Sequence, residues 1–141
     1  MKINEKKNKR FFVYPEKKET GFNVYIWVNK LEMRKYLNSR NPHEDVQDIV
    51  ACVLWNAKDE NEKIIGEMHF NQECLSIETI IHETFHATFR WARYKQIKTN
   101  LTYSAKLNFT VEDKIAYAGG RLVKQIQRKL KKLNLPQSEN A

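Results

Sequence analysis

The stretch that decides the fold is IETIIHETFHATFRW, residues 77–91, because it combines a helical pattern with an H-E-x-x-H motif. On a helix, His82 and His86 lie one turn apart and about 40° apart around the axis, so both imidazoles point the same way. One divalent ion can bind both rings. Glu83 falls near the same rim, where its carboxylate can hydrogen-bond an attacking water without binding the metal. This arrangement is typical of metal-assisted hydrolysis.

One long helix is predicted to carry the motif. Ser76 is a typical N-cap, and Glu78 places a carboxylate in the first turn, where it favours the positive end of the helix. Apolar side chains recur every three or four residues, which predicts one buried stripe. The stripe consists of Ile81, Phe85, Phe89 and Ala92. His82 and His86 flank it, so we expect them to be half-buried. The alternative is a pair of buried, hydrogen-bonded histidines without a metal.

A catalytic zinc site usually has three protein ligands, so the third must come from another segment. The chain has two further histidines, His43 in a polar loop and His69 in a strand-like segment, and we interpret both as surface or sheet residues. The adjacent acids Glu112 and Asp113 are better candidates. On a helix predicted for residues 111–133, Glu112 shares the apolar face, whereas Asp113 points about 100° away. Glu112 is therefore the predicted ligand, with Asp113 as the alternative. The apolar face comprises Ile115, Gly119, Leu122, Val123, Ile126 and Leu130.

Four segments before the motif are rich in aromatic and β-branched residues, which favours strands. They are residues 10–15, 22–29, 48–57 and 63–71. A polar turn separates the members of each pair, so two hairpins are predicted. A short amphipathic helix is predicted between the pairs. The expected fold is α+β, with a small, largely antiparallel sheet packed on the motif helix, plus a C-terminal helix. We expect a single domain over residues 1–141, with a basic arm over about 1–9 and a frayed tail over about 135–141.

The order of these features resembles the zincin metallopeptidases, and among them the glutamate-ligand group. An H-E-x-x-H helix is followed by an acid at the start of the next helix. Two segments carry the likeness, GEMHFNQECLSIETIIHETFHATF (66–89) and VEDKIAYAGGRLV (111–123). They are similar to minimal zincin domains of phage and bacterial origin.

The resemblance implies a zinc-dependent peptidase that hydrolyses peptide bonds in a protein or peptide substrate. It implies Zn²⁺ held by His82, His86 and an acid at Glu112 or Asp113, with Glu83 as the general base. It also implies that strand 63–71 is an edge strand that pairs with an extended substrate. An oxyanion partner is needed as well, and the candidates are Arg90, Tyr94, Tyr103 and Tyr117.

Composition limits the setting in which the chain works. Two cysteines, Cys52 and Cys74, are too few for a disulfide-stabilised secreted domain, so both are expected to be free thiols. No apolar run reaches the roughly 18 residues that span a bilayer, and the N-terminus does not resemble a signal peptide. These features predict a cytoplasmic protein, bacterial or in a phage-infected host, that does not bind membranes.

The net charge of +8 suggests a second class of function. Basic residues gather at the two ends of the chain, and five of them form a stripe opposite the apolar face of the C-terminal helix. They are Arg121, Lys124, Arg128, Lys131 and Lys132. Such a stripe can bind nucleic acid, or it can be a solvated face that keeps the protein soluble. The alternative function is therefore a catalytically idle protein of the same fold that binds a host protein or nucleic acid.

Overall fold

The fold is built around one mixed β-sheet. The computed structural model describes residues 3, 8–42, 49, 51–55, 63–99, 108–135 and 137. The strands are β1 (Lys9–Val13), β2 (Gly21–Trp27), β3 (Ala51–Trp55) and β4 (Ile64–Asn71), and their order in the sheet is β1-β2-β4-β3. Both predicted hairpins are confirmed, because β1 pairs antiparallel with β2 and β3 pairs antiparallel with β4. The two hairpins join through a parallel pairing of β2 with β4.

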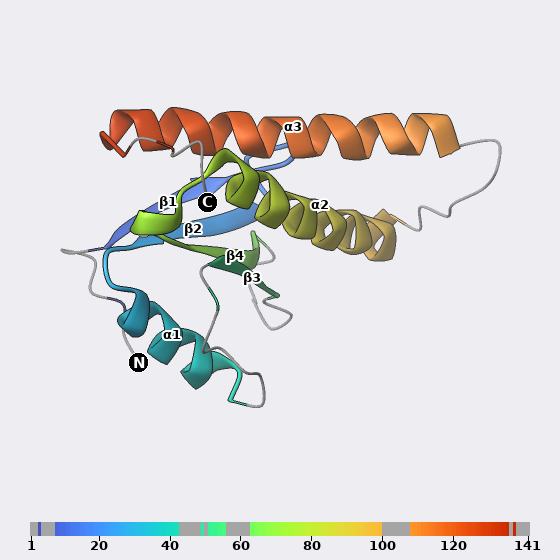
Figure 1. Cartoon of the computed structure of the whole chain (residues 1–141). Helices are drawn as coiled ribbons and strands as arrows, with labels where there is room; N and C mark the ends of the chain where they lie inside the picture. Colours follow the sequence, from blue (N-terminus) through green and yellow to red (C-terminus); the bar gives the residue numbers. More distant parts are fainter. Residues whose placement is uncertain are drawn as a thin grey trace.

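Helices cover both faces of this sheet (Figure 1). α1 (Lys30–Arg40) lies on one face, whereas α2 (Ile77–Thr99) and α3 (Asn108–Lys132) lie on the other. A short 3₁₀ turn, η1 (Gln72–Cys74), leads from β4 into α2. α2 contacts β3 and β4, and α3 contacts β1. The predicted α+β class is therefore confirmed.

Alternation along the strands divides the core into two clusters. In β4, Met68 and Phe70 face α2 and α3, whereas Glu67 and His69 point to the α1 face. Successive side chains of a strand point to opposite faces. Because helices cover both faces of this sheet, nearly every side chain of β4 is buried, and the burial does not alternate along the strand. The cluster under α1 contains Tyr25, Trp27, Met33, Tyr36 and Leu37.

α2 begins where the sequence predicts, but a different stripe of it is buried. The Ser76 hydroxyl accepts a hydrogen bond from the Thr79 amide at 3.0 Å, which confirms the N-cap. The predicted stripe is wrong, because Phe85 and Phe89 are each 60% exposed. The buried side chains lie part of a turn further round the helix and include Ile80, Thr84, Ala87, Thr88 and Trp91. This face is selected because it meets both the sheet and α3, a choice that apolar periodicity alone does not reveal.

The C-terminal end of α3 is fixed more firmly than predicted. Asn134 has a positive φ of 55°, a conformation that Asn adopts more readily than most residues. The amides of Asn134 and Leu135 then bond the carbonyls of Lys131 and Leu130, at 3.1 and 2.8 Å, which forms a Schellman cap. Leu135 packs against the core, so the predicted fraying does not begin there.

The N-terminal arm also contacts the domain, at two residues. Asn8, just before β1, is buried, and its side-chain oxygen accepts a hydrogen bond from the Val28 amide at 2.9 Å. Ile3 packs against the cluster beneath α1. The predicted basic arm over about 1–9 therefore contacts the domain within its described residues.

The free thiols that the sequence predicts are confirmed, since neither Cys52 nor Cys74 forms a disulfide. Burial is the main cause that raises the pKa of the Cys52 thiol to about 12, and the charges of Glu83 and Glu67 add to it. Within the described part of the chain, none of the helices has both the length and the apolar character needed to cross a membrane.

Gly66 in β4 is closely surrounded, and Gly120 in α3 is not, so substitutions at these two glycines test how tightly β3 and β4 pack. A Cβ on Gly66 would lie 2.5 Å from the Leu54 carbonyl oxygen in β3, whereas one on Gly120 in α3 meets no heavy atom within 4 Å. Gly66→Ala should therefore destabilise the protein by about 1–3 kcal/mol, because β3 and β4 must separate. Gly120→Ala should stabilise it by about 0.5–1 kcal/mol, the helical advantage of alanine. Urea unfolding measures both, and a neutral Gly66→Ala would contradict the β3–β4 pairing.

Candidate functional site

The two motif histidines face each other on the exposed side of α2. Their Nε2 atoms lie 3.2 Å apart, and the rings meet nearly edge to face. The His82 side chain is 66% exposed, so the expected half-burial is wrong for this residue. The alternative of a buried, hydrogen-bonded pair is wrong in its burial, because both histidines are exposed, although their rings lie within hydrogen-bond distance. At this distance, one ring nitrogen can donate a hydrogen bond to the other when neither is charged.

Glu83 differs from its neighbours because it is buried. Only 6% of the residue is exposed, and a carboxylate oxygen lies 3.9 Å from His82 Nε2. Burial raises the pKa of the Glu83 carboxyl above its ordinary value of 4.5, although the charge of His82 acts in the opposite direction. Glu83 therefore combines a raised proton affinity with a position beside the histidine pair, which is what a general base requires.

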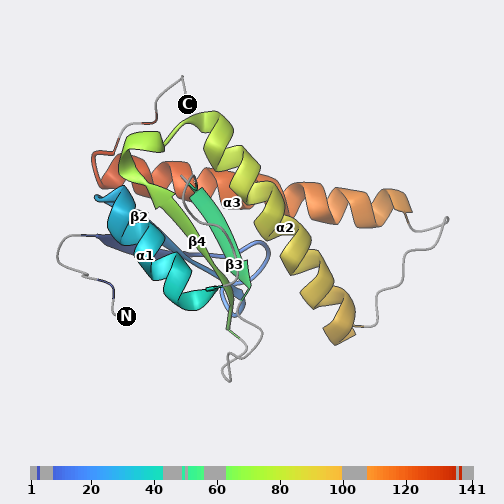
Figure 2. The ribbon, with the colours of Figure 1, turned by 60° about the horizontal axis from the view of Figure 1, so that its bottom comes forward.

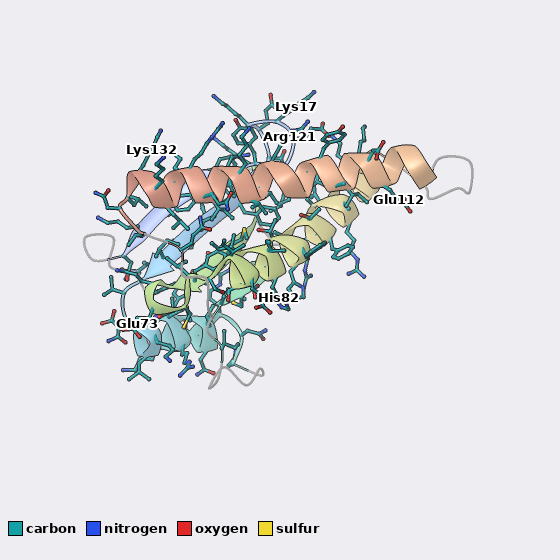
Figure 3. The ribbon with its side chains drawn as sticks, turned by 45° about the horizontal axis from the view of Figure 1, so that its top comes forward. Lys17, Glu73, His82, Glu112, Arg121 and Lys132 are labelled. Carbon is teal, nitrogen blue, oxygen red and sulfur yellow. The ribbon has the colours of Figure 1, made fainter. Side chains whose placement is uncertain are left out.

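The predicted third ligands do not lie beside the histidines. Figure 3 shows Glu112 near the start of α3, well separated from His82. Glu112 and Asp113 are both exposed, and no group of three His, Cys, Asp or Glu side chains that could hold a metal ion occurs within the described ranges. His43 lies outside the described residues. The ligand role of Glu112, or of Asp113, stays a prediction.

His69 belongs to the opposite face of the sheet. It is completely buried in β4, and its Nδ1 accepts a hydrogen bond from the Trp27 indole at 2.9 Å. Its ring stacks on Tyr25 with centroids 4.9 Å apart. The interpretation of His69 as a residue of the sheet is confirmed.

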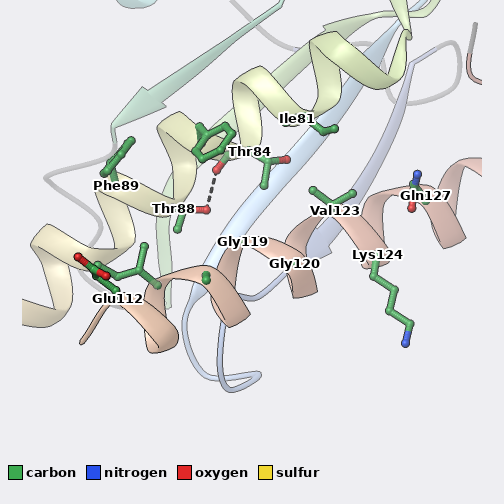
Figure 4. Close-up of a pocket in the computed structure, with 13 residues that line it drawn as sticks. Ile81, Thr84, Thr88, Phe89, Glu112, Gly119, Gly120, Val123, Lys124 and Gln127 are labelled. Carbon is green, nitrogen blue, oxygen red and sulfur yellow. Dashed lines mark hydrogen bonds between the residues drawn. The ribbon is translucent and has the colours of Figure 1, made fainter. Parts of the chain in front are cut away.

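Figure 2 shows that α2 and α3 cross and then diverge. An open apolar groove of about 660 Å³ lies between them, and Phe85, Phe89 and Ile115 line it. Gly119 permits close approach at the crossing, because a Cβ there would lie 3.3 Å from Thr88 Oγ1. Glu112 lies at one end of the groove beyond Phe89 (Figure 4). The exposed aromatic residues of α2 therefore line a groove instead of a core.

The edge strand next to α2 is β3, and the expectation for strand 63–71 is wrong. β4 lies inside the sheet between β2 and β3, so its backbone bonds are already used. Among the described residues β3 pairs only with β4. The negative charge of Glu83 in α2 helps to raise the pKa of the Cys52 thiol in β3. The edge strand of this hairpin is thus β3, which comes before β4 in the sequence.

The candidate oxyanion partners lie in different surroundings. Arg90 follows His86 by one helical turn, so it lies on the same side of α2. Tyr94 packs against the core, and Tyr117 is exposed on α3. Tyr103 lies outside the described residues. Arg90 is the candidate that the helix places next to the pair.

A buried polar cluster on the α1 face was not foreseen from the sequence. Glu67 accepts hydrogen bonds from the Tyr36 hydroxyl at 3.1 Å and from Arg40 at 2.6 Å. Its carboxylate also lies 3.5 Å from His69 Nε2. The available signal was the period of β4, which places Glu67 and His69 on one face two residues apart.

Comparisons with protein-family models, with curated proteins and with solved structures found no match to this chain.

Proposed function

We propose that this protein is a zinc-dependent peptidase that uses His82 and His86 as metal ligands and Glu83 as the general base. The observation that carries the proposal is the convergence of the two Nε2 atoms, 3.2 Å apart, beside a buried carboxylate. The pattern resembles the zincin metallopeptidases at the level of the motif and its helix.

The histidine pair fits a zinc ion. Zn–N bonds are about 2.0–2.1 Å long, and two nitrogens at a tetrahedral zinc are therefore about 3.3–3.4 Å apart. The separation of 3.2 Å is close to that value without any rearrangement of α2. Glu112 lines the groove between α2 and α3, whereas His82 and His86 do not, so a third ligand from Glu112 or Asp113 would require a different placement of the first turns of α3.

The residues of the chain divide the chemistry between them. His82 and His86 would hold the zinc ion, which would supply Lewis acidity for activating a water molecule and polarising the scissile carbonyl. Glu83 accepts the proton of the attacking water and later gives it to the leaving amine. Burial favours this role, because it raises the pKa of the Glu83 carboxyl above its ordinary value and so strengthens it as a proton acceptor. The free edge of β3 offers backbone groups to an extended peptide beside the site.

Zinc content tests the ligands. Parent protein purified without added metal should contain about one Zn²⁺ per chain, whereas His82→Ala should contain far less, because one imidazole alone holds the ion weakly. Glu112→Ala should weaken zinc binding far more than Asp113→Ala, a control with the same change in charge. Elemental analysis and zinc titration measure both effects. A full equivalent of zinc in His82→Ala would overturn the ligand assignment, and a larger loss in Asp113→Ala would make Asp113 the third ligand.

Cleavage of a broad peptide library tests the activity itself. The parent should generate new N-termini that disappear on treatment with a chelator and return when zinc is added. Zinc-loaded parent that cleaves nothing would favour the alternative, a binding protein of the same fold. The exposed basic side chains of α3 and the distance of Glu112 from His82 are the observations in favour of that alternative.

A further inference from the structure

The outer face of α3 is basic and free of carboxylates over most of its length. Five exposed side chains define what we call the α3 basic face, and they are Arg121, Lys124, Arg128, Lys131 and Lys132. No Asp or Glu occurs anywhere between Lys114 and Lys132. Among the described residues, no ion pair joins the α3 basic face to a carboxylate. Its charge is therefore available to an outside partner.

The docked β1–β2 turn extends this surface. Arg121 donates a hydrogen bond to the Pro15 carbonyl at 3.1 Å, and Gln125 donates one to the Tyr14 carbonyl at 2.7 Å. The same turn carries exposed Lys17 and Lys18, and Figure 3 shows Lys17 near Arg121.

Two acids also belong to the turn. Glu16 is paired with Lys95 at 3.3 Å, and Glu19 carries one negative charge. With Glu16 paired to Lys95, the turn presents the two positive charges of Lys17 and Lys18 against the one negative charge of Glu19.

We propose that the α3 basic face binds the phosphate backbone of nucleic acid without regard to sequence. Arg121 and Lys132 are separated by about 16 Å along the helix, at 1.5 Å per residue. One DNA strand carries about five phosphates over that length, which equals the number of basic side chains. Tyr117 lies one turn before Arg121 and is 68% exposed, so its hydroxyl can donate a further hydrogen bond to a phosphate beside these charges.

The packing of α3 favours nucleic acid over a membrane. Helices that lie in a membrane surface insert an apolar face into the acyl region. The apolar face of α3 is already used in the core, where Ala118, Leu122, Ile126 and Leu130 are completely buried. From Arg121 to Lys132 every exposed side chain of α3 is basic, and electrostatic contact with a polyanion needs no insertion.

Fluorescence anisotropy with a mixed-sequence 20-base-pair DNA duplex tests the proposal. A plot of the logarithm of the binding constant of the parent against the logarithm of salt concentration should have a slope of about −4, as expected for four to five phosphate contacts. Arg128→Glu/Lys131→Glu should lose at least about tenfold in affinity at 100 mM salt, and its slope should fall to about −2 or −3. A second duplex of unrelated sequence should bind the parent within about twofold.

The control changes the same net charge elsewhere. Lys30→Glu/Lys35→Glu alters α1 on the opposite face of the sheet and should change affinity by less than about twofold. If the glutamate pair unfolds α3, Arg128→Gln/Lys131→Gln should still lower the affinity and the slope. Equal losses in the α3 and α1 variants, no binding of duplex DNA by the parent, or binding of anionic lipid vesicles instead would each overturn the proposal. Glu83→Gln should leave DNA binding unchanged, so the result is independent of peptidase activity.

Discussion

Glu83→Gln should abolish peptide hydrolysis while leaving the protein folded and loaded with zinc. Removal of a positioned proton acceptor lowers turnover by about 10²–10⁴-fold. Glutamine has nearly the same shape, and the proposed metal ligands are His82 and His86, so the zinc content should not change. The measurement is kcat on a cleaved peptide, together with elemental analysis of the same preparation.

The melting temperature of the variant distinguishes loss of the general base from damage to the folded site. The pKa of Glu83 is higher in the folded protein than its ordinary value of 4.5, mainly because of burial. The folded state therefore binds the proton more tightly than the unfolded state does, and the carboxyl lowers stability as pH rises above 4.5. Glu83→Gln removes that cost, so the variant should melt at the same temperature as the parent or higher at pH 7.

The pH profile and a matched variant complete the test. The parent should show an acidic limb displaced above pH 4.5, since protonation of Glu83 removes the base, and the limb should be absent in any residual activity of the variant. Glu78→Gln makes the same change on an exposed residue in the first turn of α2 and should retain full activity. A Glu83→Gln protein that cleaves as fast as the parent would rule out the general-base role.

The sequence predicted local structure well and the rotation of α2 badly. Ser76, the two hairpins and the extent of α3 follow from caps, β-branched runs and periodicity, which depend on near neighbours. The buried face of α2 depends on where the sheet and α3 lie. Thr84 and Thr88 contribute to that face because a small residue at Gly119 lets the helices cross there. Phe85 and Phe89 look like core residues in the sequence and instead line a groove.

For the candidate site, too, the sequence predicts the arrangement within one helix but not the arrangement between two helices. His82, Glu83 and His86 belong to one helix, so their mutual geometry follows from a fixed turn and rise. Glu112 belongs to another helix, and its distance from the histidines depends on how far α2 and α3 diverge (Figure 2). Helical phase gives the direction in which a side chain points around the axis of its helix. It does not give the distance between the axes of two helices.

Glu67→Ala should destabilise the protein by about 3 kcal/mol at pH 7. The Tyr36 hydroxyl and Arg40 both donate to this buried carboxylate, and the loss of the acceptor leaves the Tyr36 hydroxyl buried without it. Removal of one member of a buried pair costs about 3–5 kcal/mol, and we take the low end because Arg40 is 37% exposed and can reach water.

The loss should depend on pH in a defined direction. Burial alone would raise the pKa of Glu67, but contacts with His69, Arg40 and Tyr36 outweigh it, so the pKa lies below 4.5. A depressed folded pKa contributes stability that is present above pH 4.5 and is lost as pH falls through the folded value. The difference between parent and Glu67→Ala should therefore be full at pH 6–7 and shrink below pH 4.5.

His69 adds a second acid-sensitive term to the parent. Desolvation lowers its pKa below 6.5, although Glu67 acts against that shift. The unfolded chain therefore takes up a proton before the folded chain does, and parent stability should begin to fall as pH drops below 6.5. Because Glu67→Ala removes the partner that favours protonated His69, this fall should be at least as steep in the variant between pH 6.5 and 5.

Urea unfolding from pH 7 to 4 measures these terms, with Glu73→Ala as the control. Glu73 is exposed directly after β4, so its removal should change stability by less than about 0.5 kcal/mol. Glu67 lies across the sheet from α2, so Glu67→Ala should retain the zinc content and the kcat of the parent below its melting temperature. A loss independent of pH would mean that Glu67 acts through packing rather than charge. A reduced kcat at full folding would instead place the cluster in the catalytic machinery.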